Sequence, residues 1–219
     1  MNSRSKSADQ RPAPRLYLIT PPIADASAFA GDLTAALAAA DVAAVLLRLA
    51  DAGERELINC AKSLAPIAQA RDTALILDGH TEFVARAGAD GAHFLDIDAF
   101  SAALPTLKPE RIVGAGGLTT RHDAMLAAES GADYVMFGEP DANGQRPAFA
   151  AIEERLAWWA EVFEAPCVGY AAQFDEIAPL VAAGADFVAL GDWIWADTAA
   201  VPDALARAAR EMALPETAP

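Results

Sequence analysis

Charged side chains stand at the ends of several short apolar runs of this chain. Arg48 ends one run, Asp78 ends another, and Asp98 lies just beyond a third. Carboxylates of this kind can hold a hard cation such as Mg²⁺ together with substrate oxygens, and a guanidinium can contact a phosphate through two hydrogen bonds. The same residues also have structural uses, since aspartate caps helices and a lone arginine often pairs with an acid such as Asp51. The residue types therefore indicate either an anion and metal site or a set of caps and ion pairs.

Short aliphatic and β-branched runs, which alternate with alanine-rich helical patterns, must position these side chains. The runs predict eight strands, at residues 16–20, 42–48, 74–78, 91–94, 112–115, 134–138, 167–170 and 187–191. The helical patterns cover residues 27–40, 53–69, 81–87, 98–104, 119–130, 149–163, 173–183 and 201–212. Because the strands are almost continuously apolar, they fit a parallel sheet that is buried on both faces.

One phrase occurs three times, as AGADGAHF at 87–94, SGADYVMFG at 130–138 and AGADFVALG at 183–191. In each copy a glycine suited to a left-handed helix cap, Gly88, Gly131 or Gly184, precedes a strand. A helix–strand unit of about 25 residues fits twice into each interval between these glycines. This rhythm favours a single (β/α)8 TIM barrel of the phosphate-binding type over residues 15–214, with its chemistry at the carboxyl ends of the strands. A doubly wound open sheet uses the same alternation and is the alternative.

Composition restricts the partners. The 31 acidic and 16 basic side chains give a net charge of −15, which disfavours nucleic acid and anionic membranes and leaves a small-molecule substrate. Residues 1–14 form a polar, proline-bearing lead that we expect to be disordered, and residues 215–219 form a tail. The two cysteines, Cys60 and Cys167, are too few for a disulfide scaffold, so we expect buried free thiols in a cytoplasmic protein.

Seven stretches carry a resemblance to a known family: LYLIT, VLLRL, LILDG, GADGAHFLDID, RIVGAGG, GADYVMFGEP and AGADFVALGDWI. Over residues 15–196 the chain resembles the thiamine phosphate synthase family and its sister group, the thiazole tautomerases. The family stretches are roughly YLVTD, VQLRxK, LINDR, GVHLGQxD, IIGVSxH, GADYVGFGPxFxTxTK and GADGVAVVSAI. The resemblance implies a barrel enzyme that joins hydroxymethylpyrimidine diphosphate to thiazole phosphate, releases pyrophosphate and uses Mg²⁺.

The resemblance also assigns roles to the charged residues. Asp78 and Asp98 correspond to the two carboxylates that hold Mg²⁺ in the family. Arg48 corresponds to the arginine of QLRxK, and Arg146 falls where TxTK has its lysine. Both arginines are thus the expected catalytic residues, acting on the pyrophosphate group.

The expected substrate contacts depart from the family pattern at the last two strands. Ala171 and Ala172 stand where the family has Gly-Gly, and Asp192 would repel a phosphate at the helix start that follows the eighth strand. A glycine pair after the fifth strand is either an anion seat or a loop before a helix capped by Thr119 or Thr120. The substrate-binding residues expected in full are Arg48, His80, His93, Gly116, Gly117, Gly138, Ala171, Ala172, Asp192 and Trp193.

Three functions stay open at this point. The chain is a divergent thiamine phosphate synthase, a barrel enzyme for another small substrate, or a silent relative that binds ligands without catalysis. The second would have an apolar pocket shaped by Trp193, Trp195, Tyr170 and Phe94, whereas the third would have a blocked mouth. Aromatic residues of the helix at 149–163 either form an apolar face for a homodimer or pack on the barrel. They are Phe149, Trp158, Trp159 and Phe163.

Overall fold

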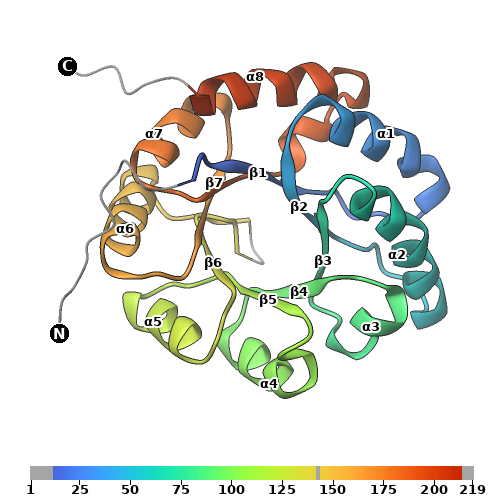
Figure 1. Ribbon diagram of the computed structural model, residues 1–219, viewed down its shortest axis with the longest axis horizontal. Helices are drawn as coiled ribbons and strands as arrows, with labels where there is room; N and C mark the ends of the chain where they lie inside the picture. Colours follow the sequence, from blue (N-terminus) through green and yellow to red (C-terminus); the bar gives the residue numbers. More distant parts are fainter. Residues whose placement is uncertain (1–11, 142–143, 214–219) are drawn as a thin grey trace.

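The computed structural model describes residues 12–141 and 144–213, which form a closed barrel of eight parallel strands with the helices around the outside (Figure 1). The strands are β1 Arg15–Ile19, β2 Val42–Leu47, β3 Ala74–Asp78, β4 Gly91–Phe94, β5 Ile112–Ala115, β6 Tyr134–Phe137, β7 Cys167–Ala171 and β8 Phe187–Leu190. Strand β1 pairs with both β2 and β8, so the sheet closes on itself. The predicted barrel is therefore confirmed, and the open sheet is excluded. Apart from residues 12–14, the predicted lead and tail lie outside the described residues.

The outer layer contains one helical segment after each strand. The helices are α1 Ala26–Ala39, α2 Glu54–Gln69, α3 Val84–Ala87, α4 Ile97–Leu107, α5 Arg121–Glu129, α6 Phe149–Val162, α7 Ile177–Ala182 and α8 Val201–Ala213. Short 3-10 turns precede α3 and α7, at Thr81–Phe83 and Phe174–Glu176, and two more follow β8, at Asp192–Trp195 and Thr198–Ala200. We expected this helix to end at Leu104, before Pro105, but α4 continues to Leu107. Pro105 lacks a backbone N–H, and the loss of this one hydrogen-bond donor does not end the helix. Helix α5 begins after Thr120, whose hydroxyl caps Asp123 N as one of the two expected caps.

Alternate side chains of the strands face opposite layers. One set packs against the helices in a large apolar cluster. The other set fills the barrel interior and consists of Tyr17, Ile19, Ala44, Leu46, Ile76, Tyr134, Met136, Val168, Tyr170 and Ala189. Two of its tyrosines, Tyr17 in β1 and Tyr134 at the start of β6, place their hydroxyl groups within hydrogen-bond distance of each other, which matters for the site described below.

The repeated phrase builds the opposite, amino-terminal rim. Its glycines Gly88, Gly131 and Gly184 have φ values of 72°, 103° and 96°, which confirms the predicted left-handed conformation. The aspartate of each copy directly precedes a strand. Its carboxylate accepts a hydrogen bond from an amide at the start of the preceding strand, and its own amide donates to the carbonyl of the same residue. These aspartate clasps join Asp90 to Leu75 (2.7 Å), Asp133 to Val113 (2.7 Å) and Asp186 to Cys167 (2.9 Å), measured from carboxylate to amide.

The first strand pair has a variant of the same device. Asp41 precedes β2 as the other aspartates precede β4, β6 and β8. It accepts two hydrogen bonds from the Arg15 guanidinium, at 2.9 and 2.7 Å, in place of a backbone amide. All four even-numbered strands are thus tied to their predecessors by an aspartate at the amino-terminal rim.

The aromatic residues of α6 pack inward and on one another. Trp159 is fully buried, and its ring stacks on Phe163 with centroids 4.1 Å apart. Trp158 and Phe149 are partly buried against the same core. This packing agrees with the second of the two alternatives for these residues, and a homodimer stays a prediction. Among the described residues, no helix has the length and apolarity needed to cross a membrane.

Candidate functional site

A cavity of about 480 Å³ lies at the carboxyl ends of the strands, directly above the barrel interior. We call it the central cavity. Four acids, one arginine and one histidine contribute to its wall, so it carries several charges beside its apolar side chains. Its lining residues are Ile19, Leu46, Arg48, Asp78, His93, Leu95, Met136, Glu139, Pro140, Asp141, Gly144, Tyr170 and Asp192. This is the rim at which the sequence predicted the chemistry.

Arg48 lies directly after β2, between two acids of the central cavity. Its Nη1 donates to both carboxylate oxygens of Asp192, at 2.8 and 3.0 Å, and its Nε lies 3.8 Å from Asp78 Oδ2. The side chains of Arg48 and Asp192 are 36% and 53% exposed, so water screens the pair. An anionic ligand can therefore replace Asp192 as the partner of this guanidinium.

Arg146 is held in a different way. Its Nη1 donates to both oxygens of Glu176, at 2.9 and 3.0 Å, while Nε donates to Gly138 O and Nη2 to Tyr170 O. Arg146 and Glu176 are only 20% and 10% exposed. Every nitrogen of this guanidinium is engaged inside the protein, so Arg146 ties the loop after β6 to the end of β7.

Backbone amides that we expected to bind a phosphate donate instead to carboxylates of the chain itself. Ala172 N donates to Glu176 Oε2 at 2.8 Å, and Gly117 N donates to Glu139 Oε1. Next to the first of these, Trp193 donates its indole N–H to Ala171 O at 2.9 Å. Neither Trp193 nor the two alanines line the central cavity. The phosphate seat expected after β7 and β8 is thus filled by internal contacts.

A hydrogen-bonded chain in the barrel interior reaches the central cavity at His93, which we call the floor of the cavity. The Tyr17 and Tyr134 hydroxyls lie 2.8 Å apart, and the Tyr134 hydroxyl lies 3.0 Å from His93 Nδ1. All three side chains are buried. Burial lowers the pKa of His93 to about 3, so the imidazole is neutral at physiological pH. His93 was expected either to bind substrate or to be a satisfied core residue, and the structure places it between the core and the cavity.

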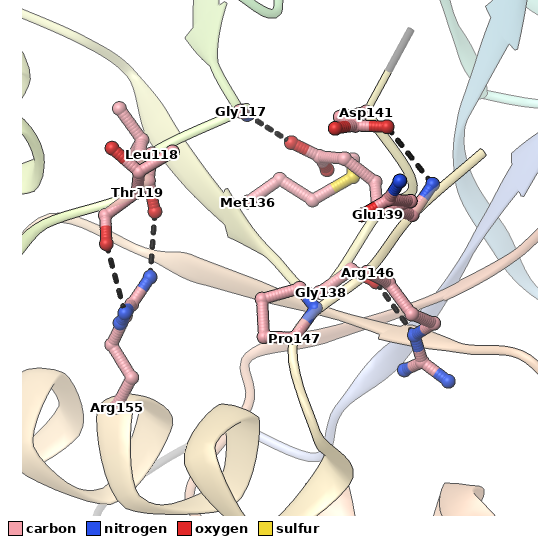
Figure 2. A pocket seen from close by; sticks show the side chains of 11 residues that line it. Gly117, Leu118, Thr119, Met136, Gly138, Glu139, Asp141, Arg146, Pro147 and Arg155 are labelled. Carbon is pink, nitrogen blue, oxygen red and sulfur yellow. Dashed lines mark hydrogen bonds between the residues drawn. The ribbon is translucent and has the colours of Figure 1, made fainter. Parts of the chain in front are cut away.

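Glu139 follows β6 and reaches across to the loop after β5, where its Oε1 accepts a hydrogen bond from the Gly117 amide (Figure 2). Burial raises the pKa of Glu139 to about 7, against the lowering effect of the Gly117 amide, and the nearby charge of Asp78 raises it further. Its second oxygen, Oε2, is buried and has no hydrogen-bond partner among the described residues, and the same holds for His93 Nε2. In the same view Arg155 donates to the carbonyls of Leu118 and Thr119, which fixes the loop that Glu139 contacts.

Of the two expected metal ligands, only Asp78 lies on the wall of the central cavity. Asp78 lines the central cavity, and burial raises its pKa while Arg48 lowers it. Asp98 is exposed in the first turn of α4 and does not line the central cavity, whereas Asp96 caps that helix through Ala99 N. Within the described ranges, no cluster of three or more His, Cys, Asp or Glu side chains is arranged to hold a metal ion by itself.

His80 was expected to join the site and lies beside it. It adopts a left-handed conformation in the turn after β3, with φ of 59°. Its ring stacks on Phe83 with centroids 4.7 Å apart, and its Nδ1 lies 3.6 Å from Glu82 Oε1. His80 does not line the central cavity, so its turn shapes the edge of the site without reaching the floor.

Sequence reasoning missed four side chains of the site: Glu139, Glu176, Tyr17 and Tyr134. Glu139 carried a signal, because it stands at the proline of the family stretch GFGPxF. The two tyrosines look like ordinary strand residues, and Glu176 looks like an ordinary acid at a helix start. Only the closed barrel brings Tyr17 to Tyr134, which lie 117 positions apart in the chain.

Comparisons with known proteins agree with this architecture. The chain is 44% identical to the thiamine-phosphate synthase of Rhodospirillum centenum over 189 residues, which covers 83% of this chain and 89% of that protein. It is 37% identical over 200 residues to the thiamine-phosphate synthase of Hyphomonas neptunium, covering 86% and 89%. Among solved structures, thiamine phosphate pyrophosphorylase from Pyrococcus furiosus superposes with a TM-score of 0.73 at 20% identity, covering 91% of this chain and 95% of that one. The latter likeness supports the fold.

The family assignment rests on the length of the match as well as on these relatives. The sequence model of the family described as thiamine monophosphate synthase matches residues 16–194, which extend from the second residue of β1 into the turn after β8. Together with the relatives above 30% identity, this match is decisive: the chain belongs to the thiamine monophosphate synthase family.

Proposed function

We propose that this chain is a thiamine phosphate synthase, which condenses hydroxymethylpyrimidine diphosphate with thiazole phosphate and releases pyrophosphate. The observation that carries the proposal is the family match over the whole barrel, combined with a central cavity in which a replaceable guanidinium faces carboxylates. A guanidinium and an acid on one wall suit a diphosphate that is bound together with a hard cation.

In this proposal Arg48 contacts the diphosphate and Arg146 positions the wall. Arg48 exchanges Asp192 for phosphate oxygens, since the two carboxylate contacts at 2.8 and 3.0 Å have the geometry that a phosphate reproduces. Arg146 remains on Glu176 and keeps the loop after β6 against β7. A fixed wall limits the motion of the bound ligand, which favours attack on the pyrimidine carbon.

The donor set fits a Mg²⁺ ion that takes most of its ligands from the diphosphate and water. Mg²⁺ commonly uses only one or two protein carboxylates, and Asp78 offers one from the cavity wall. The resemblance implies Asp98 as the second, from its exposed place on α4. A bound Mg²⁺ would neutralise part of the charge on departing pyrophosphate.

The test is product formation with purified protein. We expect thiamine phosphate from the two phosphorylated substrates with Mg²⁺, and none with EDTA. We also expect Asp78→Asn to lose Mg²⁺-dependent turnover, and Asp98→Asn to lose it only if α4 supplies the second ligand. No product from the wild type, together with no rescue of a thiamine auxotroph, would refute the proposal.

The two alternatives fit the cavity less well. An enzyme for another substrate was expected to present Trp193 and Trp195 to an apolar pocket. Instead Trp193 donates to Ala171 O and Trp195 donates to Ile19 O, so both indoles are committed to the barrel. A silent relative was expected to have a blocked mouth, whereas the central cavity holds about 480 Å³.

A further inference from the structure

Two buried polar atoms, on two residues that line the central cavity, have no hydrogen-bond partner among the described residues. They are His93 Nε2 and Glu139 Oε2. His93 is 0% exposed, and both residues line the cavity. A buried polar group without a partner is uncommon in a native protein, and it often marks the place where a ligand completes the hydrogen bonding.

The tyrosine chain below fixes what His93 presents to the cavity. If Tyr17 donates to Tyr134 and Tyr134 donates to His93 Nδ1, both hydroxyl protons have acceptors. In the reverse arrangement the Tyr17 proton has no acceptor in the described part of the chain. Because an unpaired buried donor is costly, the first arrangement is favoured. The neutral imidazole then carries its proton on Nε2 and offers a donor to the cavity.

Gly116 leaves room for the Glu139 carboxyl next to the His93 ring. A Cβ on Gly116 would lie 2.0 Å from Glu139 Oε1 and 2.5 Å from His93 Nε2. The family stretch IIGVSxH has serine at this position. The Glu139 carboxyl therefore fills the space that a serine side chain would need, and the glycine and the glutamate are compatible only as a pair.

We propose that Glu139 is a substrate-contacting residue that, with His93, recognises the edge of an aminopyrimidine ring. His93 Nε2 donates to a ring nitrogen, and Glu139 Oε2 accepts from the adjacent amino group. The Gly117 amide holds Oε1 and so orients the carboxylate. This inference rests on the proposed function, because it assigns the pyrimidine ring of that substrate to the cavity floor and leaves its diphosphate to Arg48.

The test separates the ring from the diphosphate by calorimetry at pH 8, where Glu139 is ionised. The probes are the aminopyrimidine diphosphate with Mg²⁺, the same compound with hydrogen in place of the amino group, and Mg²⁺–pyrophosphate. We expect Glu139→Gln to weaken binding of the first probe about 10- to 100-fold, because its amide would direct N–H donors at the amino group. Binding of Mg²⁺–pyrophosphate should change less than about twofold, as should binding of the desamino compound, because neither offers the amino group.

The matched control is Glu161→Gln, an exposed glutamate of α6, which should leave all three affinities unchanged. The wild type provides a second measurement that needs no variant, since it should prefer the amino to the desamino compound by the same factor. Equal affinity for both compounds, or equal loss for the ring and for pyrophosphate in Glu139→Gln, overturns the inference. If either occurs while the wild type still forms thiamine phosphate, only this inference fails. If the wild type neither forms product nor binds any probe, the proposed function fails and this inference fails with it.

Discussion

The two halves of the carboxyl rim differ in how completely their polar groups are paired. On one side, Arg146 and Glu176 satisfy each other in a shielded network that also engages two backbone carbonyls. On the other side and on the floor, Arg48 is held by an exposed acid, and Glu139 has an unpaired oxygen within the described residues. A protein has no structural reason to leave groups unpaired, so the second half is where a ligand contributes most.

The difference also explains how two arginines of one rim acquire different tasks. Each donates from Nη1 to both oxygens of a carboxylate, yet Glu176 is 10% exposed and Asp192 is 53% exposed. The energy of such a pair depends on solvent screening and on what remains if one partner leaves. We therefore expect substitutions at Arg146 to affect the fold and substitutions at Arg48 to affect binding.

Arg146→Ala removes the cation of the shielded Arg146–Glu176 pair, and we expect it to have the largest effect of these substitutions. It leaves the Glu176 carboxylate buried without its cation, so we expect a loss of about 3 to 5 kcal/mol in the free energy of unfolding, measured in urea. The double variant with Glu176→Gln should recover part of this loss. If Arg146→Ala is as stable as the wild type but loses pyrophosphate binding, the two arginines have exchanged roles.

Glu139→Gln tests the other side of the rim through the pH dependence of stability. The pKa of Glu139 is raised to about 7 in the folded protein, so the folded state holds this proton more tightly than the unfolded state. The Glu139 carboxyl therefore costs no stability below its unfolded pKa and increasingly costs stability as the pH rises to 7. At pH 8 we expect the glutamine variant to be more stable than the wild type by up to about 3 kcal/mol.

This advantage should shrink to about 0.4 kcal/mol near pH 4.5, where the Glu139 carboxyl is protonated in the folded state and about half protonated in the unfolded state. The measurement is thermal or urea unfolding of the two proteins between pH 4.5 and 8. A difference in stability that does not vary with pH would mean that Glu139 does not titrate in this range.

Arg48→Ala should weaken binding of Mg²⁺–pyrophosphate about 10- to 100-fold, because a charge-assisted contact is lost. Its stability should fall by less than about 1 kcal/mol, as expected for an exposed ion pair. Arg86→Ala is the matched control, since Arg86 forms an exposed pair with Glu54 on the outer surface. Unchanged pyrophosphate affinity in Arg48→Ala would remove Arg48 from the binding site.

Asp192→Asn should have the smallest effect, and it should strengthen pyrophosphate binding where Arg48→Ala weakens it. Asp192 competes with a phosphate for Arg48, so its neutralisation should raise pyrophosphate affinity by about two- to fivefold at low salt. Calorimetry at two salt concentrations would measure this gain. Weaker binding in Asp192→Asn would make Asp192 a ligand rather than a competitor.

The barrel could be predicted from the sequence because its signals are local. Apolar runs of four to six residues placed all eight strands within one residue of their ends, and glycine caps marked three of the helix-to-strand turns. The site could be predicted where a charged residue ends a strand or directly follows it, as Asp78 and Arg48 do. Glu176 could not be recognised, because its partner Arg146 lies 30 positions away and no local pattern joins them.

Glu139 and Gly116 show a different limit. Each departs from the family stretches on its own, and each looks like a loss when it is considered alone. Their relation is steric, since the carboxyl of one occupies the space of the side chain that the other lacks. A single sequence shows that both positions differ from the family, but it does not show that Glu139 lies against Gly116 in the fold.

The aspartate clasps have a consequence for how this barrel can change over evolutionary time. Each clasp closes a two-strand unit at the amino-terminal rim with two hydrogen bonds, and Arg15 with Asp41 closes the first unit by an ion pair. The barrel thus consists of four quarter-barrels, each of which is locked at the end remote from the ligand. Loops at the other end are free to lose a phosphate seat or to exchange a serine for a distant carboxylate while the quarters stay assembled. The residues of the catalytic rim can therefore diverge in one two-strand unit while the other units keep their structure.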